Sequence, residues 1–341
     1  MALPSNRPTM RDVAVASGVA IKTVSRVMNG EPHVRPDTTQ RVRAAAAELG
    51  YVLHEQAAEL RRRDGGSRAL GLLVSSVSNP FDSQVHGAVE RVARSAGLMV
   101  VAASTGDDPD LELAALTTLL GRRLDGLIIS TIREEHGLLA REINRGWPVV
   151  FVDRAVDDIE CDTVTVDNVG GVRAAVRHLR AHGHRRLAFL ANKMAIRTTQ
   201  ERLRGFDEET DGDPECLRVT DLAAEDDVRA AVTELLTGEE SPTALVTARN
   251  EISIATMRTL QHLGRQHSVA LVGFDDIPMA DLVTPGLSVV AQDPDAIGEL
   301  SARRVLARLA GDASPPQHTV LPTTLIARGS GEIRAEPSAG R

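Results

Sequence analysis

The sequence predicts an all-α helix-turn-helix head, followed by an α/β body of two doubly wound lobes with parallel sheets. The chain has 341 residues, which is enough for two or three folding units. Residues 8–51 have the pattern of short helices separated by tight turns, whereas short apolar strands alternate with amphipathic helices from Ala69 onward. Near-continuous apolar strands that alternate with helices are typical of parallel sheets covered on both faces.

The strands of the body are short and rich in Val, Leu and Ile. We expect them at Leu70–Ser75, Met99–Ala103, Gly126–Ser130, Val149–Val152, Thr163–Val166, Leu187–Leu190, Ala244–Thr247, Val269–Gly273 and Ser288–Ala291. Helix-length segments such as Gln84–Ala96 and Val169–His182 separate most of them. Because this run is too long for one sheet, we expect two lobes. The first would comprise residues 69–184 with 292–319, and the second residues 185–291 with 320–331, leaving 332–341 as a tail.

Composition excludes several classes of protein. No apolar run approaches the roughly 20 residues that a membrane span needs. The N-terminus has no basic patch followed by an apolar stretch, as a signal peptide would. Cys161 and Cys216 have no metal-type spacing and do not suggest a disulfide scaffold. We therefore expect a protein of the reducing cytoplasm with no membrane partner.

Charge is distributed unevenly, although the formal net charge of -8 by itself argues against a nucleic-acid binder. Residues 1–68 hold 11 Lys and Arg against 7 Asp and Glu, which leaves 28 against 40 in the rest of the chain. A basic head on an acidic body confines the attraction for phosphates to one end. Chance alone is the competing explanation for this division.

The head has the sequence signals of three helices. Thr9 is a good N-cap with Asp12 as its partner three residues later, and Gly18 can take the positive φ of a tight turn. The second helix is expected at residues 20–28, and Asn29-Gly30 ends it. Its inner side would carry Val24, Val27 and Met28. The third helix would begin at Pro36, stop at Gly50 and pack through Val42, Ala45, Ala46 and Leu49.

Two short helices joined by a tight glycine turn, the second with a polar outer face, are typical of a helix-turn-helix that binds in the DNA major groove. Lys22 and Arg26 can bond to guanine O6 and N7, and Ile21 can contact a thymine methyl group. The rest of the expected DNA surface comprises Thr9, Thr23, Ser25 and Asn29, where the hydroxyl groups suit phosphate oxygens. A generic three-helix bundle with solvated charges is the alternative.

The run T-M-R-D-V-A-V-A-S-G-V-A-I-K-T-V-S-R-V-M-N at residues 9–29, followed by V-R-P-D-T and L-G-Y, resembles the head of the Lac-repressor (LacI/GalR) family. By that resemblance Ile21, Lys22 and Arg26 read bases, and Ile21-Lys22 set the operator preference. The chain departs from the family at Ala20 and Arg35, where serine is common. Because the loss of a hydroxyl cap typically costs about 1 kcal/mol, we expect a less firmly anchored second helix.

Residues 52–68 are expected to form a hinge helix and linker. His54–Arg63 reads HEQAAELRRR, which has good helix propensity, but an isolated helix of this length is marginal and would order only with a partner. The resemblance implies that Leu60 wedges into the minor groove and that Ala57 allows two hinge helices to approach closely. The usual Pro-Asn ahead of the hinge is replaced by Leu53-His54. A flexible basic linker is the alternative.

The resemblance continues from Leu70 to about Gly329, through landmarks such as GLLVSSVSNPF, VTVDNVGGVRAAVRHL, LVGFDD and VVAQDP. It implies a periplasmic-binding-protein-like sensor. Ligands in such folds bind at the carboxyl ends of the strands, where polar residues with fixed donors and acceptors suit a ligand with vicinal hydroxyls. The expected effector-binding residues are Asn79, Phe81, Arg202, Asn250, Asp275 and Gln292. Plain turn chemistry is the alternative for Asp275-Asp276.

Two departures leave the effector open. Asp82 stands where an aromatic residue is common in the family, and the acidic stretch after Phe206 looks shorter than in relatives. Aromatic platforms for a sugar ring are few, with Phe81, Trp147 and Phe206 as candidates. A small polyol, a sugar acid or a poorly responsive site all remain compatible with the sequence.

Enzymatic function is not indicated. The chain has no G-x-G-x-x-G, P-loop, G-x-S-x-G or H-E-x-x-H motif. His178 and His182 are four residues apart with His184 nearby, but no carboxylate or cysteine spacing supports a metal site. Asp153-Arg154 follows a strand and fits lobe structure or a cleft contact. We expect no catalytic residues, no metal and no cofactor.

Together these patterns predict a sequence-specific DNA-binding transcription regulator, most simply a repressor. It would bind a pseudo-palindromic operator as a homodimer, and a sugar-like small molecule would control it. No heptad-like tail follows Gly329, which favours a dimer over a tetramer. Two alternatives are a regulator that binds DNA independently of any effector and a solute-binding protein, which the head domain argues against.

Overall fold

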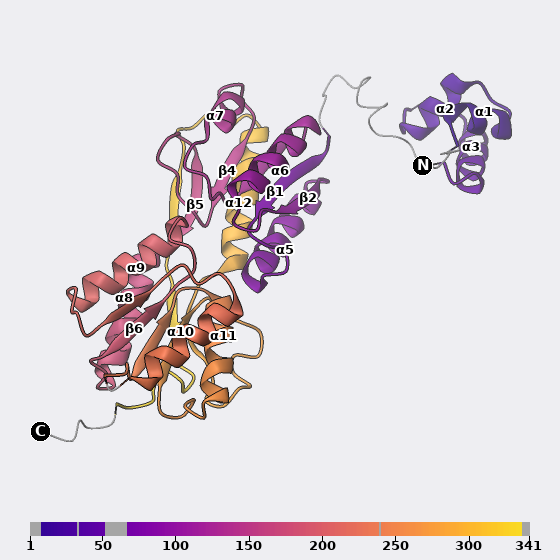
Figure 1. The fold of residues 1–341 in the computed structure, drawn as a ribbon. Coiled ribbons are helices and arrows are strands. Elements are labelled where there is room, and N and C mark those ends of the chain that lie inside the picture. Colours follow the sequence, from indigo (N-terminus) through magenta and orange to yellow (C-terminus); the bar gives the residue numbers. More distant parts are fainter. Residues whose placement is uncertain (1–7, 33, 52–66, 239, 336–341) are drawn as a thin grey trace, which may run out of the picture. The chain divides into compact units, whose positions relative to one another are not determined.

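The computed structural model describes residues 8–32, 34–51, 67–238 and 240–335. The chain divides into a head unit, Met1–Ser67, and a larger sensor unit, Arg68–Arg341 (Figure 1). The predicted hinge at 52–68, with Ala57 and Leu60, lies almost entirely outside the described residues.

The head consists of α1 (Met10–Ser17), α2 (Ile21–Met28) and α3 (Pro36–Glu48). The predicted start of α1 is confirmed, because the Thr9 hydroxyl accepts from the Asp12 N–H at 3.3 Å and the Thr9 N–H donates to the Asp12 carboxylate at 2.7 Å. Gly18 ends the helix with a φ of 66°. The core of the head comprises Val13, Val24, Val27, Val42, Ala45, Ala46 and Tyr51. The prediction that Leu49 packs there is wrong, since this side chain is 37% exposed.

The first sheet of the sensor has the strand order β11-β5-β4-β3-β1-β2, and every pairing in it is parallel. Its strands are β1 (Ala69–Val74), β2 (Met99–Ser104), β3 (Gly126–Ile129), β4 (Val149–Val152), β5 (Asp162–Val166) and β11 (His318–Leu321). One face packs against α5 (Pro80–Ser95) and α12 (Pro294–Leu309). The other packs against α6 (Pro109–Gly121) and α7 (Gly137–Ile143). This lobe is therefore doubly wound, as predicted.

The second sheet has the order β12-β10-β9-β8-β6-β7. Its strands are β6 (Leu187–Leu190), β7 (Leu217–Val219), β8 (Ala244–Thr247), β9 (Ala270–Phe274), β10 (Ser288–Ala291) and β12 (Thr324–Ile326). They are parallel except for β12, which pairs antiparallel to β10. Helices α8 (Asn168–Ala181) and α9 (Arg197–Thr210) cover one face. Helices α10 (Glu225–Thr237) and α11 (Asn250–His262) cover the other.

The structure corrects the predicted lobe boundaries. Helix α8, assigned above to the first lobe, packs on the second sheet through Val172, Ala175, Val176 and Leu179. The chain therefore first crosses between lobes after β5 rather than at residue 184. Its last crossing follows β11, which extends to Leu321 on the first sheet instead of stopping at 319. Residues 332–335 are not all a free tail, since Glu332 accepts hydrogen bonds from Ser288 and Gly329. The apolar face of a helix shows that it is buried but not which sheet buries it.

Within the part of the chain that the structure describes, no helix has both the length and the apolar character needed to span a membrane.

Candidate DNA-binding surface and inter-lobe pocket

Helix α2 presents the outward surface that the sequence predicts. Val24 and Val27 are buried in the head core, whereas Ile21 is 51% exposed and Lys22 is also exposed. Ser25 and Arg26 are half-buried on the same helix. Ala20, at the N-cap, provides no side-chain cap. Because Val24 and Val27 fix one side of the helix in the core, the helical repeat directs Ile21 and Lys22 toward solvent.

Several predicted DNA contacts already have partners within the head. Arg26 donates from Nε to Glu31 at 3.3 Å and from Nη2 to the Pro32 carbonyl at 3.4 Å. Asn29 donates to the Ser25 hydroxyl at 3.3 Å. The Thr9 hydroxyl donates to Asp12 at 2.7 Å, so in this structure it is occupied by the helix cap. Exposed ion pairs such as Arg26–Glu31 contribute little energy, so DNA can displace them.

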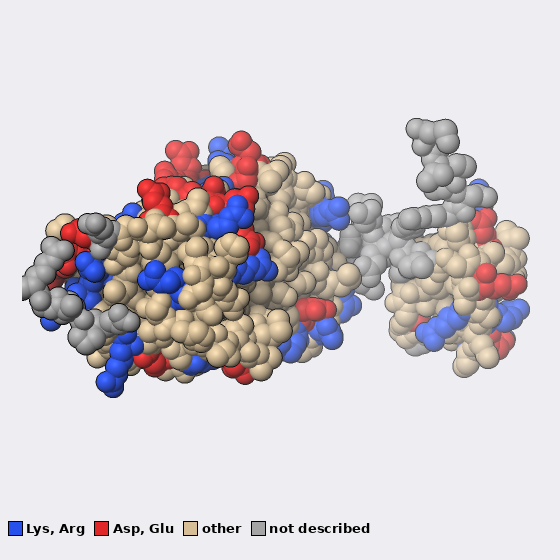
Figure 2. Space-filling view, turned by 60° about the horizontal axis from the view of Figure 1, so that its bottom comes forward, with Lys and Arg blue, Asp and Glu red and all other residues tan. Residues whose placement is uncertain are grey.

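The described part of the head has only a small excess of basic over acidic residues. Residues 8–51 hold six Lys or Arg against four Asp or Glu, and the rest of the predicted basic excess lies mainly at Arg61–Arg63. On the face shown in Figure 2, the Asp and Glu side chains of the sensor gather toward one edge, and much of the remaining face is uncharged.

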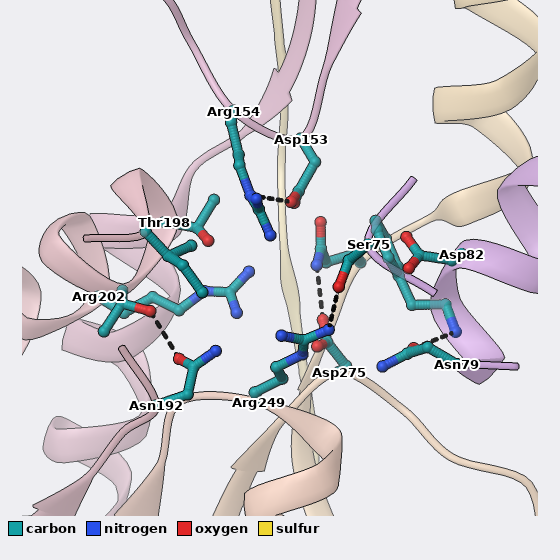
Figure 3. A pocket seen from close by; sticks show the side chains of 14 residues that line it. Ser75, Asn79, Asp82, Asp153, Arg154, Asn192, Thr198, Arg202, Arg249 and Asp275 are labelled. Atoms are coloured by element: carbon teal, nitrogen blue, oxygen red, sulfur yellow. Dashed lines mark hydrogen bonds and ion pairs between the residues drawn. The ribbon is translucent and has the colours of Figure 1, made fainter. Parts of the chain in front are cut away.

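A narrow pocket lies between the two lobes of the sensor and measures about 30 Å³. Figure 3 shows charged and amide side chains entering it from both lobes. Its lining comprises Ser75, Asn79, Phe81, Asp82, Asp153, Arg154, Asn192, Ile196, Thr198, Thr199, Arg202, Arg249, Asp275 and Gln292. Five of the six predicted effector residues are in this set, and Asn250 is not.

Asn250 instead forms an amide pair with Asn79. Asn79 Nδ2 donates to Asn250 Oδ1 at 3.0 Å, and Asn250 Nδ2 donates to Asn79 Oδ1 at 2.9 Å. Asn79 is the N-cap of α5 in the first lobe, whereas Asn250 is the first residue of α11 in the second. Both side chains are buried. This reciprocal pair therefore joins the lobes, and the adjacent residue, Arg249, enters the pocket.

Arg202 is held rigidly at the pocket wall. Its guanidinium lies 3.7 Å from the centre of the Phe274 ring. It donates to Asn168 Oδ1 at 2.8 Å and to the Ala248 carbonyl at 2.6 Å. The side chain is 4% exposed, and burial lowers the pKa of its guanidinium. Asp275, directly after β9, has a φ of 71° and accepts from Gln292 Nε2 at 2.5 Å.

Sequence reasoning missed an ionic cluster centred on Asp107, which follows β2. Arg154, on the same lobe, donates to Asp107 Oδ1 at 2.6 Å, and Arg249, on the other lobe, donates to Asp107 Oδ2 at 2.6 Å. Burial alone would raise the pKa of Asp107, but the two guanidinium groups outweigh it and hold that pKa below its usual value. Arg249 also donates to the Ser75 hydroxyl at 2.8 Å. The cluster bridges the lobes, which no local sequence signal could indicate.

Two further carboxyls line the pocket: Asp82, and Asp153, for which a cleft contact was one of the two interpretations of the sequence. Burial raises the pKa of Asp82 to about 7, although the Ser76 N–H donates to its carboxylate at 2.8 Å. Burial also raises the pKa of Asp153, which follows β4 with a φ of 65°. Asp153 occupies the same place after β4 that Asp275 occupies after β9. The strand-end rule that selected Asp275 could therefore have selected Asp153 as well.

The remaining candidate residues have structural surroundings. Phe206 is fully buried in the core of the second lobe, and Trp147 donates from Nε1 to the Leu124 carbonyl, so only Phe81 lines the pocket. His178 bonds to Glu332, and His184 contacts Thr243 and the Ile333 carbonyl. Among the described residues no group of three or more His, Cys, Asp or Glu is placed to hold a metal ion.

Comparison with known families gives two matches. The model described as "Bacterial regulatory proteins, lacI family" matches residues 9–53. The model described as "Periplasmic binding protein-like domain" matches residues 176–331.

Curated relatives match along nearly the whole chain. The HTH-type transcriptional regulator PtxS of Pseudomonas aeruginosa is 32% identical, over 96% of this chain and 97% of its own. The HTH-type transcriptional regulator CelR of Thermobifida fusca is 31% identical, over 95% and 98%. The ribose operon repressor of Escherichia coli is 28% identical, over 94% and 99%.

Solved structures agree with these matches. A Lac repressor dimer bound to operator and the anti-inducer ONPF is 28% identical, with a TM-score of 0.79, covering 96% of this chain and 99% of that one. A CelR–cellobiose complex is 30% identical, with a TM-score of 0.69, covering 95% and 100%.

Proposed function

The chain belongs to the lacI family of DNA-binding transcription regulators, and from this premise we propose that it is a repressor controlled by a small molecule. In this proposal a homodimer binds a pseudo-palindromic operator, and a sugar-like effector binds in the inter-lobe pocket. As a regulator of transcription, it acts in the compartment that holds the chromosome, the bacterial cytoplasm. Its relatives are regulators rather than enzymes.

The outward face of α2 carries the DNA-binding part of the proposal. Ile21, Lys22 and Arg26 are placed to reach base edges, while the hydroxyl groups of Thr23 and Ser25 suit phosphate oxygens. Thr9 and Asn29 would join them once DNA displaces their present partners. We assign Ala57 and Leu60, which lie outside the described residues, to minor-groove contacts on the strength of the family resemblance.

Dimerisation follows from the size of the head. One short recognition helix reads too few base pairs for high specificity, whereas two heads related by two-fold symmetry read half-sites about one helical turn apart. Effector control follows from the pocket, which takes residues from both lobes. A ligand that binds there shifts the equilibrium between two arrangements of the lobes. The size of this shift equals the difference between its binding free energies for the two arrangements.

The test is binding of the full-length protein to its own promoter region, followed by fluorescence anisotropy with and without small sugars. Lys22→Gln is expected to change which sequences bind, because it alters a base-reading position. Arg202→Ala is expected to spare DNA binding and abolish the effector response. Failure to bind any DNA at low salt would contradict the proposal, as would the reverse behaviour of these two variants. Operator binding that no small molecule changes would support the effector-independent alternative.

A further inference from the structure

We propose that the effector is a sugar acid, whose carboxylate binds among the guanidinium groups of Arg154, Arg202 and Arg249. This inference rests on the proposed function, since it names the ligand class for the same inter-lobe pocket. The three arginines come from three elements: the loop after β4, the interior of α9, and the N-cap of α11. Figure 3 shows their side chains converging on the pocket from different sides.

Arg202 lacks a counter-charge in direct contact. Its two hydrogen bonds go to neutral oxygens, on Asn168 and Ala248, and its guanidinium stacks on the Phe274 ring. Among the described residues it forms no ion pair, and Asp153 and Asp275 act on it only from a distance. A buried cation without a direct partner is costly. An anionic group on the ligand would therefore stabilise this side chain more than a neutral hydroxyl would.

Arg154 and Arg249 share the carboxylate of Asp107. Each also has a second carboxylate near its Nε, namely Asp153 at 3.5 Å from Arg154 and the exposed Glu251 at 3.1 Å from Arg249. Arg154 is 3% exposed, and its buried Nε makes no hydrogen bond to the described residues beyond the long ion-pair contact with Asp153. The pocket thus presents a donor on Arg154 that has only a long ion-pair contact, and a charge on Arg202 that has no ion-pair partner among the described residues. Guanidinium groups recognise carboxylates through paired charge-assisted hydrogen bonds.

The pocket carboxyls do not cancel this charge in full. Burial raises the pKa of Asp82 to about 7, so this carboxyl is about half protonated at neutral pH, and burial also raises the pKa of Asp153. A protonated carboxyl donates a hydrogen bond, as a ligand carboxylate requires. Asp275 remains as an acceptor, and Gln292 Oε1 is buried without a partner. These acceptors suit hydroxyl groups, which favours a hydroxylated acid over a simple inorganic anion.

A neutral sugar fits the lining less well. Neutral sugar rings are commonly stacked on aromatic faces, and here Phe81 alone among aromatic residues lines the pocket. The 30 Å³ cavity holds little more than a water molecule, so the ligand enters with a change in lobe arrangement. Arg249 lies on one lobe, and Arg154 and Asp107 lie on the other. A carboxylate between the two arginines would compete with Asp107 and so couple binding to that change.

The experiment compares matched acids and neutral analogues on the full-length protein. The panel contains C5 and C6 aldonates, 2-ketoaldonates and uronates, paired with the alditols, ketoses and aldoses of the same configuration. Sugar phosphates form a third arm. Thermal melting and isothermal titration measure binding directly, and operator affinity is measured separately. We expect at least one carboxylate to raise the melting temperature and to bind about 10-fold or more tightly than its neutral partner.

Variants test the arginines themselves. Arg202→Gln removes the charge but keeps polar character, and we expect it to lose about 10-fold or more in affinity for the acid. Arg204→Gln, an exposed position on the same helix, is the matched control and should bind normally. Should Arg202→Gln fail to fold, Arg249→Gln makes the same test.

The outcomes separate this inference from the proposed function. Tighter binding of a neutral sugar or of a sugar phosphate overturns the inference, as does a panel in which no acid binds, and each leaves operator binding intact. Failure to bind DNA overturns the proposed function, whereas acid binding to the sensor would still support the inference.

Discussion

Asp82 links the chemistry of the pocket to the stability of the folded chain. Burial raises its folded-state pKa to about 7 from an ordinary value of 3.8. The folded state therefore holds a proton that the unfolded state has already released. The stability contributed by this proton is complete below pH 4 and is lost as the pH rises through 7.

Asp82→Asn is expected to remove this pH dependence, because an amide cannot ionise. Between pH 5.5 and 8 the wild-type protein should lose about 2 kcal/mol of unfolding free energy relative to the variant. Urea denaturation at both pH values measures the difference. Asp110→Asn, an exposed substitution, should follow the wild type at both pH values. Parallel pH profiles for Asp82→Asn and the wild type would show that the carboxyl is ionised throughout.

Glu31 restrains a residue that we assign to base contacts. Its carboxylate accepts from Arg26 Nε at 3.3 Å, and it would lie near phosphates in a complex. Glu31→Gln is expected to raise operator affinity by up to about 5-fold, since an exposed ion pair contributes at most about 1 kcal/mol. Anisotropy titration measures the operator affinity, and Glu48→Gln, at the end of α3, is the control. Equal affinities for the two variants would show that the pair does not restrain Arg26.

Most of the pocket residues that the sequence predicts follow a strand end, whereas Arg202 lies inside α9 and was expected there from the family resemblance. Asn79, Phe81, Arg202, Asp275 and Gln292 all line the pocket, as expected. Asn250 does not line the pocket and the adjacent Arg249 does, because a strand end indicates a location but not which of two adjacent side chains turns inward. Asp107 has no such signal, since its partners Arg154 and Arg249 are 47 and 142 residues away in sequence.

At the scale of elements, every central strand was predictable, but of the four edge strands only β2 was. The nine predicted strands all form, because each is a short run rich in apolar residues, including the edge strand β2. The three that were missed, β7, β11 and β12, lie at sheet edges, are only three or four residues long and have no fully buried position. Assignment of α8 to a lobe failed for a related reason, since its sequence shows a buried face without showing what buries it.

Helices α5 and α12 approach closely at Gly298. A Cβ added there would lie 2.6 Å from the Ala88 Cβ and 2.6 Å from the Val85 carbonyl oxygen. Gly298→Ala is therefore expected to destabilise the sensor by about 1–3 kcal/mol, because overpacking outweighs the better helix propensity of alanine. Urea denaturation measures the change.

The control for this substitution is Gly87→Ala in the facing helix, where a Cβ would meet nothing within 4 Å. That variant should gain about 0.5–1 kcal/mol from helix propensity alone. If both alanine variants stabilise the protein, the contact between α5 and α12 is loose enough to accept a methyl group.

At the scale of the whole sensor, the chain's own side chains hold the two lobes together. Asn79–Asn250, Arg249–Asp107 and Lys193–Asp107 each join one lobe to the other. These contacts already favour one arrangement of the lobes over another. To shift that equilibrium, an effector must bind the second arrangement more tightly, and stronger contacts require a larger difference in affinity. The amide pair is the contact that can be removed without altering net charge.

A double-mutant cycle on Asn79 and Asn250 measures that bias. Either single alanine substitution leaves one buried amide without its partner, whereas the double substitution leaves neither. The double variant should therefore lose less unfolding free energy than the sum of the two single losses, by about 0.5–3 kcal/mol. Asn79 paired with Asn192 is the control cycle, because Asn192 lines the pocket but bonds to Thr199 instead. If the losses of unfolding free energy are additive in both cycles, the amide pair does not stabilise the contact between the lobes. The ion pairs of Asp107 would then be the contacts that hold the lobes together.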